Sequence, residues 1–195
     1  MALVKENTAL QKINDPFISS FGVNLLVKRL DLNHAHISGN KWYKLKYNLE
    51  EAKKQNQRIL LTFGGAFSNH IAATAAAGKE FGFNTIGIIR GEKHSPLNPT
   101  LQFSADCGME LHYISRASYK MKTKISFIDE LYKQFGDFYL LPEGGSNTLA
   151  VKGCEEILND VKINFDYVCC SCGTAAPAGS SRPGIPAPGP CFRGC

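Results

Sequence analysis

The 195-residue chain lacks any run of about 18 apolar residues, the length that a membrane-spanning helix requires. Its start, from Met1 to Asn7, also lacks an apolar stretch of signal-peptide length. We therefore predict a cytoplasmic protein without a membrane partner.

Two nucleotide-binding motifs are missing as well. The chain contains neither Gly-x-Gly-x-x-Gly nor Gly-x-x-x-x-Gly-Lys-Ser/Thr, which removes the main sequence support for dinucleotide or Walker-type phosphate binding. Basic residues exceed acidic residues only modestly, 22 against 17, and they are spread along the chain rather than gathered into a stripe. This balance favours solubility and indicates no nucleic-acid partner.

The cysteines do not form the even, dense set of a disulfide scaffold, so we expect reduced thiols. There are seven, crowded toward the C-terminal end, at positions 107, 154, 169, 170, 172, 191 and 195. The cluster at 169 to 172 resembles a metal motif, but alternate residues of a strand face opposite sides and no second ligand pair follows at zinc spacing. We predict no metal site.

What the chain does contain is a regular hydrophobic pattern. Its apolar fraction of 44% is enough to bury a core. Short apolar runs predict strands at 25–27, 59–63, 85–89, 111–114, 138–141 and 167–170, and helical spacing predicts helices at 42–55, 71–77, 99–107, 122–135 and 149–160. Strands that alternate with helices build a parallel sheet with flanking helices, so the fold class is α/β.

Ligands of such sheets bind beyond the carboxyl ends of the strands, where glycine turns and helix N-termini leave backbone amides free. Three turns qualify: Gly64 to His70, Glu143 to Asn147, and Ser171 to Thr174. In the first, Ser68, Asn69 and His70 stand where a helix begins and suit an anionic group such as a carboxylate. The alternative is that Ser68 or Asn69 is only a helix cap. The second turn has the same alternative, a glycine turn with an Asn or Ser cap.

Lys41 is the candidate reactive residue. It follows Gly39 and Asn40 at the expected start of a helix, where the helix dipole disfavours a positive charge. An uncharged lysine amine is what attack on a carbonyl requires. Since the chain has many other lysines, an ordinary structural lysine is the alternative.

Two segments resemble a known family. The stretch Ser-Gly-Asn-Lys-Trp-Tyr-Lys-Leu-Lys-Tyr at 38–47 and the stretch Gly-Gly-Ala-Phe-Ser-Asn-His at 64–70 closely resemble the 1-aminocyclopropane-1-carboxylate deaminase and D-cysteine desulfhydrase family. The likeness extends from about Leu10 to Thr174. It implies a pyridoxal 5'-phosphate enzyme with the fold of the tryptophan synthase β subunit, a small amino acid as substrate, and a homodimer.

The resemblance also implies roles for individual residues. Lys41 matches the lysine that binds the cofactor covalently, and Ser68 matches the catalytic hydroxyl. Asn69 would contact the ring oxygen of the cofactor, and the turn of Ser68, Asn69 and His70 would hold the substrate carboxylate. Gly173 and Thr174 match the start of a phosphate-binding Gly-Thr-Gly-Gly-Thr loop, but Ala175, Ala176 and Pro177 follow instead.

The chain changes character at this loop. Residues 173–195 contain five Gly, five Pro and four Ala but no Lys and no acidic residue. The resemblance predicts residues 1–52 as part of the large cofactor-binding domain, 53–145 as a small α/β domain, 146–172 as an incomplete return to the large domain, and 173–195 as an aberrant tail. A fold left incomplete at the C-terminus would bind the cofactor poorly. A catalytically inactive α/β remnant that serves as a binding or interaction module is therefore the alternative to a desulfhydrase or deaminase.

Overall fold

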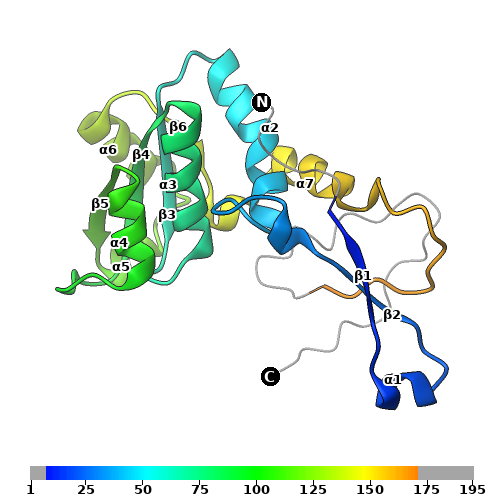
Figure 1. Ribbon diagram of the computed structural model, residues 1–195. Coiled ribbons are helices and arrows are strands. Elements are labelled where there is room, and N and C mark those ends of the chain that lie inside the picture. Colours follow the sequence, from blue (N-terminus) through cyan, green and yellow to red (C-terminus); the bar gives the residue numbers. More distant parts are fainter. Residues whose placement is uncertain (1–7, 171–195) are drawn as a thin grey trace.

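The computed structural model describes residues 8–170 (Figure 1). Its strands are β1 (Leu10–Ile13), β2 (Leu25–Lys28), β3 (Ile59–Gly64), β4 (Asn84–Arg90), β5 (Met109–Ile114) and β6 (Tyr139–Leu141). Its α-helices are α1 (Pro16–Ser20), α2 (Asn40–Lys54), α3 (Asn69–Phe81), α4 (Pro99–Asp106), α5 (Arg116–Tyr119), α6 (Ile125–Phe135) and α7 (Thr148–Glu155). Three 3-10 turns complete the set: η1 (Leu30–Leu32), η2 (Glu143–Gly145) and η3 (Glu156–Leu158).

Several helices start where the sequence supplies a cap. The side-chain oxygens of Ser68, Asn98 and Asn147 accept hydrogen bonds from backbone N–H groups in the first turns of α3, α4 and α7, respectively. Such caps satisfy donors that have no partner inside the helix. Helix α3 is also rich in alanine, the residue with the highest helix propensity.

Strands β3 to β6 form a four-stranded sheet in the order β5-β4-β3-β6, and all its pairs are parallel. Side chains alternate between its faces. On β3, Leu60 packs in a cluster with residues of α2 and α3, whereas Leu61 and Phe63 pack on the opposite face with α5 and α6. Helices therefore cover both faces of the sheet, as Figure 1 shows for α3 and α4 on the near side.

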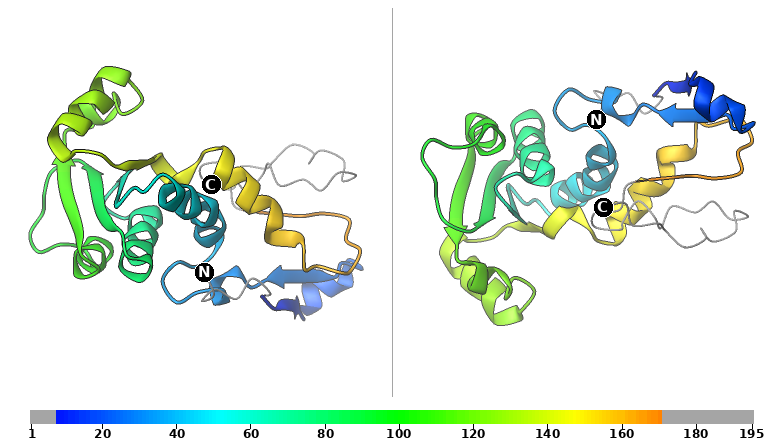
Figure 2. Two further views of the ribbon diagram at one scale, coloured as in Figure 1. Left: turned by 90° about the horizontal axis from the view of Figure 1, so that it is seen from above. Right: turned by 90° about the horizontal axis from the view of Figure 1, so that it is seen from below.

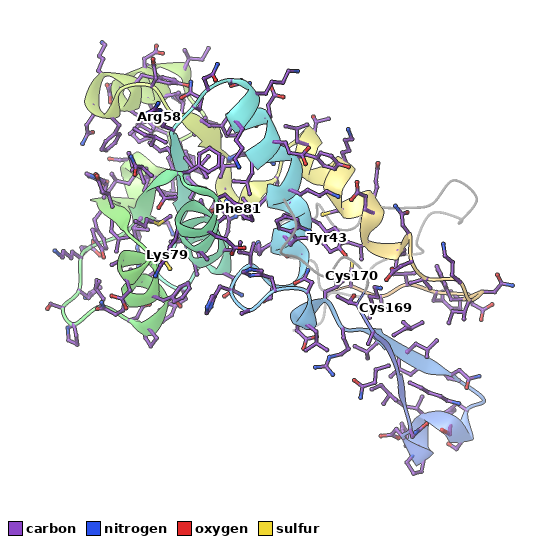
Figure 3. All side chains as sticks on the ribbon, turned by 45° about the horizontal axis from the view of Figure 1, so that its top comes forward. Tyr43, Arg58, Lys79, Phe81, Cys169 and Cys170 are labelled. Atoms are coloured by element: carbon purple, nitrogen blue, oxygen red, sulfur yellow. The ribbon has the colours of Figure 1, made fainter. Side chains whose placement is uncertain are left out.

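Helices α2 and α7 pack closely against each other beside the sheet (Figure 1). Gly153 makes this approach possible, because a Cβ atom there would stand 1.8 Å from the backbone oxygen of Tyr43. Figure 3 shows Tyr43 on α2 at the side where α7 lies. Any larger residue at Gly153 would push the two helices apart.

The first two strands form a separate hairpin. Strands β1 and β2 pair antiparallel, and α1 lies in the connection between them. Helices α2 and α7 stand between this hairpin and the sheet (Figures 1 and 2). A salt bridge between Lys28 on β2 and Asp160 anchors the hairpin to the segment after η3.

The predicted α/β class and the parallel sheet are confirmed, with four of the expected strands in that sheet. The strand expected at 25–27 exists, but its partner β1 was missed and the pair is antiparallel. The prediction of a strand at 167–170 is wrong, because these residues form no regular structure and Tyr167 is 89% exposed. An apolar run becomes a strand only where another strand meets its backbone groups, and none does so here within residues 8–170. No helix of this described part is long and apolar enough to cross a membrane.

Candidate active site

Lys41 lies in the first turn of α2, at the end of a tightly held loop. The amide side chain of Asn33, which is 2% exposed, donates to the carbonyl oxygen of Gly39 at 3.0 Å. Gly39 itself has φ 68°, in the left-handed region that favours glycine. The chain can therefore turn sharply into α2 just before Lys41.

The Lys41 amine is half-buried and its pKa is lowered from 10.5 to about 8. Removal of water from around the ammonium group is the main cause, and the positive charge of Lys44 adds to it. Both effects act in the predicted direction, because each makes the Lys41 amine lose its proton more easily. About a tenth of the amine is therefore uncharged at pH 7, and this form can attack a carbonyl.

Lys44 lies one turn further along α2 and is fully buried. Its Nζ donates to the carbonyl oxygen of Gly144 at 3.0 Å and to Oγ of Ser146 at 3.3 Å. Burial lowers its pKa as well. The turn that follows β6 is thereby tied to the same end of α2 that carries Lys41.

The glycine turn after β3 brings the second group of predicted residues to the start of α3. A Cβ at Gly64 would stand 2.8 Å from Oγ of Ser68, so glycine allows the turn to fold back on the helix. Ser68 accepts a hydrogen bond from the N–H of Ile71 at 3.4 Å, and its hydroxyl is therefore a helix cap. This cap does not use the hydroxyl proton.

The amides at this helix start are available to an anion. Within residues 8–170, the backbone N–H groups of Asn69 and His70 have no acceptor. The Asn69 side chain is exposed, whereas His70 is 2% exposed. A carboxylate at this turn would thus be held by backbone donors and by the positive end of the helix dipole.

The imidazole of His70 is not among those donors. Its Nε2 lies 2.9 Å from Oγ1 of Thr62, and burial together with the charges of Lys41 and Lys44 lowers its pKa to about 3. The ring is therefore neutral at physiological pH. A carboxylate bound at this turn would therefore be contacted by the Asn69 carboxamide and by the backbone N–H groups, not by the His70 ring.

Helices α2 and α3 contact each other, and the charge of Lys41 acts on the His70 ring, so Lys41 and the Ser68–His70 turn lie in the same region of the structure. Gly173 and Thr174, predicted to bind phosphate, lie outside the described residues. Cys169 and Cys170 are exposed, and no group of metal-ligating side chains occurs within residues 8–170. A surface hollow lined by Lys53, Arg58 and Phe81 lies at the opposite end of α2 from Lys41; Figure 3 labels Arg58 and Phe81.

Sequence reasoning missed two contributors to the site, Lys44 and Thr62, and gave no individual role to Gly145 within the second predicted turn. A Cβ at Gly145 would stand 2.8 Å from Cε1 of His70, so the turn after β6 closes over this ring. The spacing of Lys41 and Lys44 on one helical face was the available signal for Lys44. Asn147 does cap α7, as the alternative for the second turn stated.

His34 lies in the loop before α2, and its ring is partly buried. Its Nδ1 accepts hydrogen bonds from the N–H groups of His36 and Ile37 at 3.1 and 2.9 Å, and its Nε2 lies 2.9 Å from Glu80. The ring is a partly buried link between the loop and α3. Residues far apart in the chain make this link, so the local sequence could not indicate it.

Comparison with known proteins identifies relatives. A protein of Thermotoga maritima named "Putative 1-aminocyclopropane-1-carboxylate deaminase" is 33% identical over 176 residues, which are 85% of this chain and 55% of the relative. The "Bifunctional D-cysteine desulfhydrase/1-aminocyclopropane-1-carboxylate deaminase, mitochondrial" of Arabidopsis thaliana is 29% identical over 86% of this chain and 46% of the relative. The chain spans about half the length of the curated relatives it matches. No family model matches it.

Solved structures with a similar fold include proteins of the same kind as these relatives. The crystal structure of an ACC deaminase homologue superposes with a TM-score of 0.77 at 26% identity, over 91% of this chain and 56% of that one. A pyridoxal 5'-phosphate-dependent aspartate racemase gives a TM-score of 0.68 at 15% identity, over 90% of this chain and 52% of that one, and shows the likeness of fold alone. The predicted fold, that of this group of pyridoxal-phosphate enzymes, is confirmed.

Proposed function

We propose that the chain belongs to the 1-aminocyclopropane-1-carboxylate deaminase and D-cysteine desulfhydrase family, to whose members it is similar, and that it carries the reactive lysine and the carboxylate-binding turn of a pyridoxal-phosphate-dependent lyase or deaminase. The substrate would be a small amino acid. The observation that carries this proposal is the half-buried Lys41 amine, whose pKa is about 8, together with the start of α3, where two backbone amides have no acceptor among residues 8–170.

The residues around Lys41 suit the reactive end of the cofactor, whereas Ala175, Ala176 and Pro177 do not match the family's phosphate-binding loop. Lys41 would hold it covalently, since its amine loses its proton readily, and the exposed Asn69 side chain is accessible to the ring oxygen. Gly173 and Thr174 would start the phosphate-binding loop. When bound, the cofactor supplies a conjugated ring that accepts electrons from the substrate.

The chain's own residues would perform three tasks. The N–H groups of Asn69 and His70 would bind the substrate carboxylate and so orient the α-carbon. The Ser68 hydroxyl still has its proton to donate at Oγ, so it can act as an acid or base toward the substrate. Lys41, once released from the cofactor, would carry the α-proton at Nζ.

Two reactions fit these tasks, and the family's names cover both. With D-cysteine, loss of the α-proton and elimination of sulfide would give pyruvate and ammonia. With 1-aminocyclopropane-1-carboxylate, opening of the ring would precede release of ammonia. We prefer the desulfhydrase reaction, and sulfide release from D-cysteine, measured against ammonia release from the cyclopropane substrate, decides between them.

The binding step is tested by incubating the chain with pyridoxal phosphate, reducing with borohydride and mapping the modified peptide by mass spectrometry. We expect the label on Lys41 and its loss in Lys41→Ala. Lys54→Ala is the matched control, because Lys54 is an exposed lysine of the same helix. Labelling spread over the exposed lysines, with Lys41 no more modified than Lys54, contradicts the proposal and favours the inactive remnant.

The other expectations from the resemblance stay predictions. They are the homodimer, the cytoplasmic location, and the division of the chain at 52, 145 and 172. The four-stranded sheet, which begins at Ile59 and ends at Leu141, supports a small domain over 53–145.

A further inference from the structure

The hydrogen bonds around Thr62 determine the protonation pattern of the His70 ring. The hydroxyl of Thr62 lies 3.0 Å from the carbonyl oxygen of Leu141 and 2.9 Å from Nε2 of His70. A carbonyl oxygen can only accept, so the single hydroxyl proton goes to Leu141. Thr62 must then accept from His70, and Nε2 carries the proton.

The other ring nitrogen is left without a proton. In a neutral imidazole with hydrogen on Nε2, Nδ1 has a bare lone pair that can only accept a hydrogen bond. Nδ1 of His70 is fully buried and has no partner within residues 8–170. A proton on Nδ1 would also lack a hydrogen-bond partner, because no acceptor lies near this nitrogen within residues 8–170.

The surroundings of this nitrogen are positively charged. A Cβ on Gly145 would stand 3.3 Å from Nδ1, so the nitrogen faces the turn after β6 to which Lys44 also donates. Lys41 and Lys44, both on α2, are the charged groups that act on the ring. Cys154 on α7 is also near the same two lysines; burial raises the pKa of its thiol, while the charges of Lys44 and Lys41 lower it in part.

We propose that Thr62 and His70 form a positioning pair that holds a neutral imidazole, with its bare Nδ1 as a hydrogen-bond acceptor, beside Lys41 and Lys44. A third positive charge is thereby kept out of the site. A bare Nδ1 leaves no N–H dipole directed at the two lysines, so the ring adds no further repulsion to their charges. The state of the ring is independent of the proposed function, whereas its use in capturing an aldehyde rests on that function.

The first experiment observes the ring directly in the wild-type chain. Long-range ¹H–¹⁵N spectra of the ¹⁵N-labelled chain distinguish a protonated ring nitrogen from a bare one, and His70→Gln identifies which signals belong to this residue. We expect Nε2 protonated and Nδ1 bare at every value from about pH 5 to about pH 9. Either a proton on Nδ1 or titration of the ring near its ordinary pKa overturns the proposal.

The second experiment measures the effect on Lys41 by competitive acetylation with acetic anhydride across a pH series, which needs no cofactor. Thr62→Val removes the hydroxyl, and Thr62→Ser is the matched control that keeps it. In Thr62→Val the ring can place a proton on Nδ1, facing the lysines, so we expect the reactivity midpoint of Lys41 to fall by roughly half a pH unit or more. Thr62→Ser should keep the wild-type midpoint. An unchanged midpoint in a folded Thr62→Val chain overturns the effect on Lys41.

These results separate the two proposals. Failure of Lys41 to bind pyridoxal phosphate would overturn the proposed function and leave the spectra of His70 as expected. A wrong tautomer would overturn the positioning pair even if Lys41 binds the cofactor.

Discussion

The buried ammonium group of Lys44 donates a hydrogen bond to the backbone oxygen of Gly144, 3.0 Å away. The two residues are separated by 100 positions in the chain. This contact joins the start of α2 to the turn after β6 and leaves Gly145 packed against His70. Lys44 therefore sets both the shape and the charge of the surroundings of Lys41.

Replacing Lys44 tests whether its positive charge lowers the pKa of Lys41. Lys44→Met removes a neighbour that lowers the pKa of Lys41, so that pKa should rise above about 8. Because burial is the larger cause, it should stay below the ordinary 10.5. Competitive acetylation against pH measures the change. Lys44→Arg retains the charge and should leave the Lys41 midpoint near the wild-type value; equal midpoints in wild type and Lys44→Met would refute the coupling.

The lowered pKa of Lys41 also predicts a pH-dependent stability. Between about 8 and 10.5 the unfolded chain binds a proton at Lys41 that the folded chain has lost. The free energy of unfolding of the wild type should therefore rise with pH through this window relative to Lys41→Met. Below about 8 the amine is charged in both states, and the difference between the two proteins should be constant. Urea unfolding at a series of pH values measures it, and parallel curves throughout would show that the pKa is not lowered.

Asn48 is the centre of a buried polar network. It is fully buried, its Oδ1 accepts from Asn147 at 2.7 Å and from Tyr139 at 3.0 Å, and its Nδ2 donates to the carbonyl of Lys44 at 2.7 Å. Asn48→Leu leaves these partners unpaired, so we expect the free energy of unfolding to fall by about 2 kcal/mol or more. Tyr139→Phe removes one bond and should cost about 1 kcal/mol. Denaturant unfolding compares them, and a smaller loss for Asn48→Leu than for Tyr139→Phe would contradict the network.

The close approach of α2 and α7 depends on Gly153. A methyl group there would overlap the backbone oxygen of Tyr43, which stands 1.8 Å from the Cβ position, so Gly153→Ala should lower the free energy of unfolding by about 2 kcal/mol or more. Gly65→Ala is the control, because its Cβ would meet only the Arg90 side chain, at 3.6 Å. Thermal unfolding of both variants measures the difference. Equal melting temperatures would mean that the helices separate at no cost.

Much of the fold could be predicted from local patterns. The run Ile59 to Phe63 is apolar and bounded by charge and glycine, and it forms β3 in the centre of the sheet. The predictions failed for segments whose secondary structure depends on pairing with a strand that is distant in the sequence. β1 and β2 form because each pairs with the other, whereas residues 167–170, with a comparable apolar run, have no such partner in the part of the chain described here.

In the candidate site, too, local signals were predictable and contacts between distant segments were not. Lys41 and the Ser68–His70 turn were found from residue type, glycine spacing and the resemblance, since these signals lie within short segments. His70 was expected in the anion-binding turn at the helix start, and its ring meets Thr62. The local sequence placed His70 in this turn but could not indicate which neighbour its ring contacts.

The amino-acid sequence by itself determined the alternation of strands and helices, a helix start close to Lys41 and the glycine turn before α3, because short-range sterics, capping and hydrophobic period act within a few residues. Only the tertiary structure decided that Lys44 meets Gly144, that Thr62 orients His70 and that Lys41 loses part of its hydration. Those properties arise from burial and from contacts between segments distant in the chain, and they exist only once rigid elements pack together.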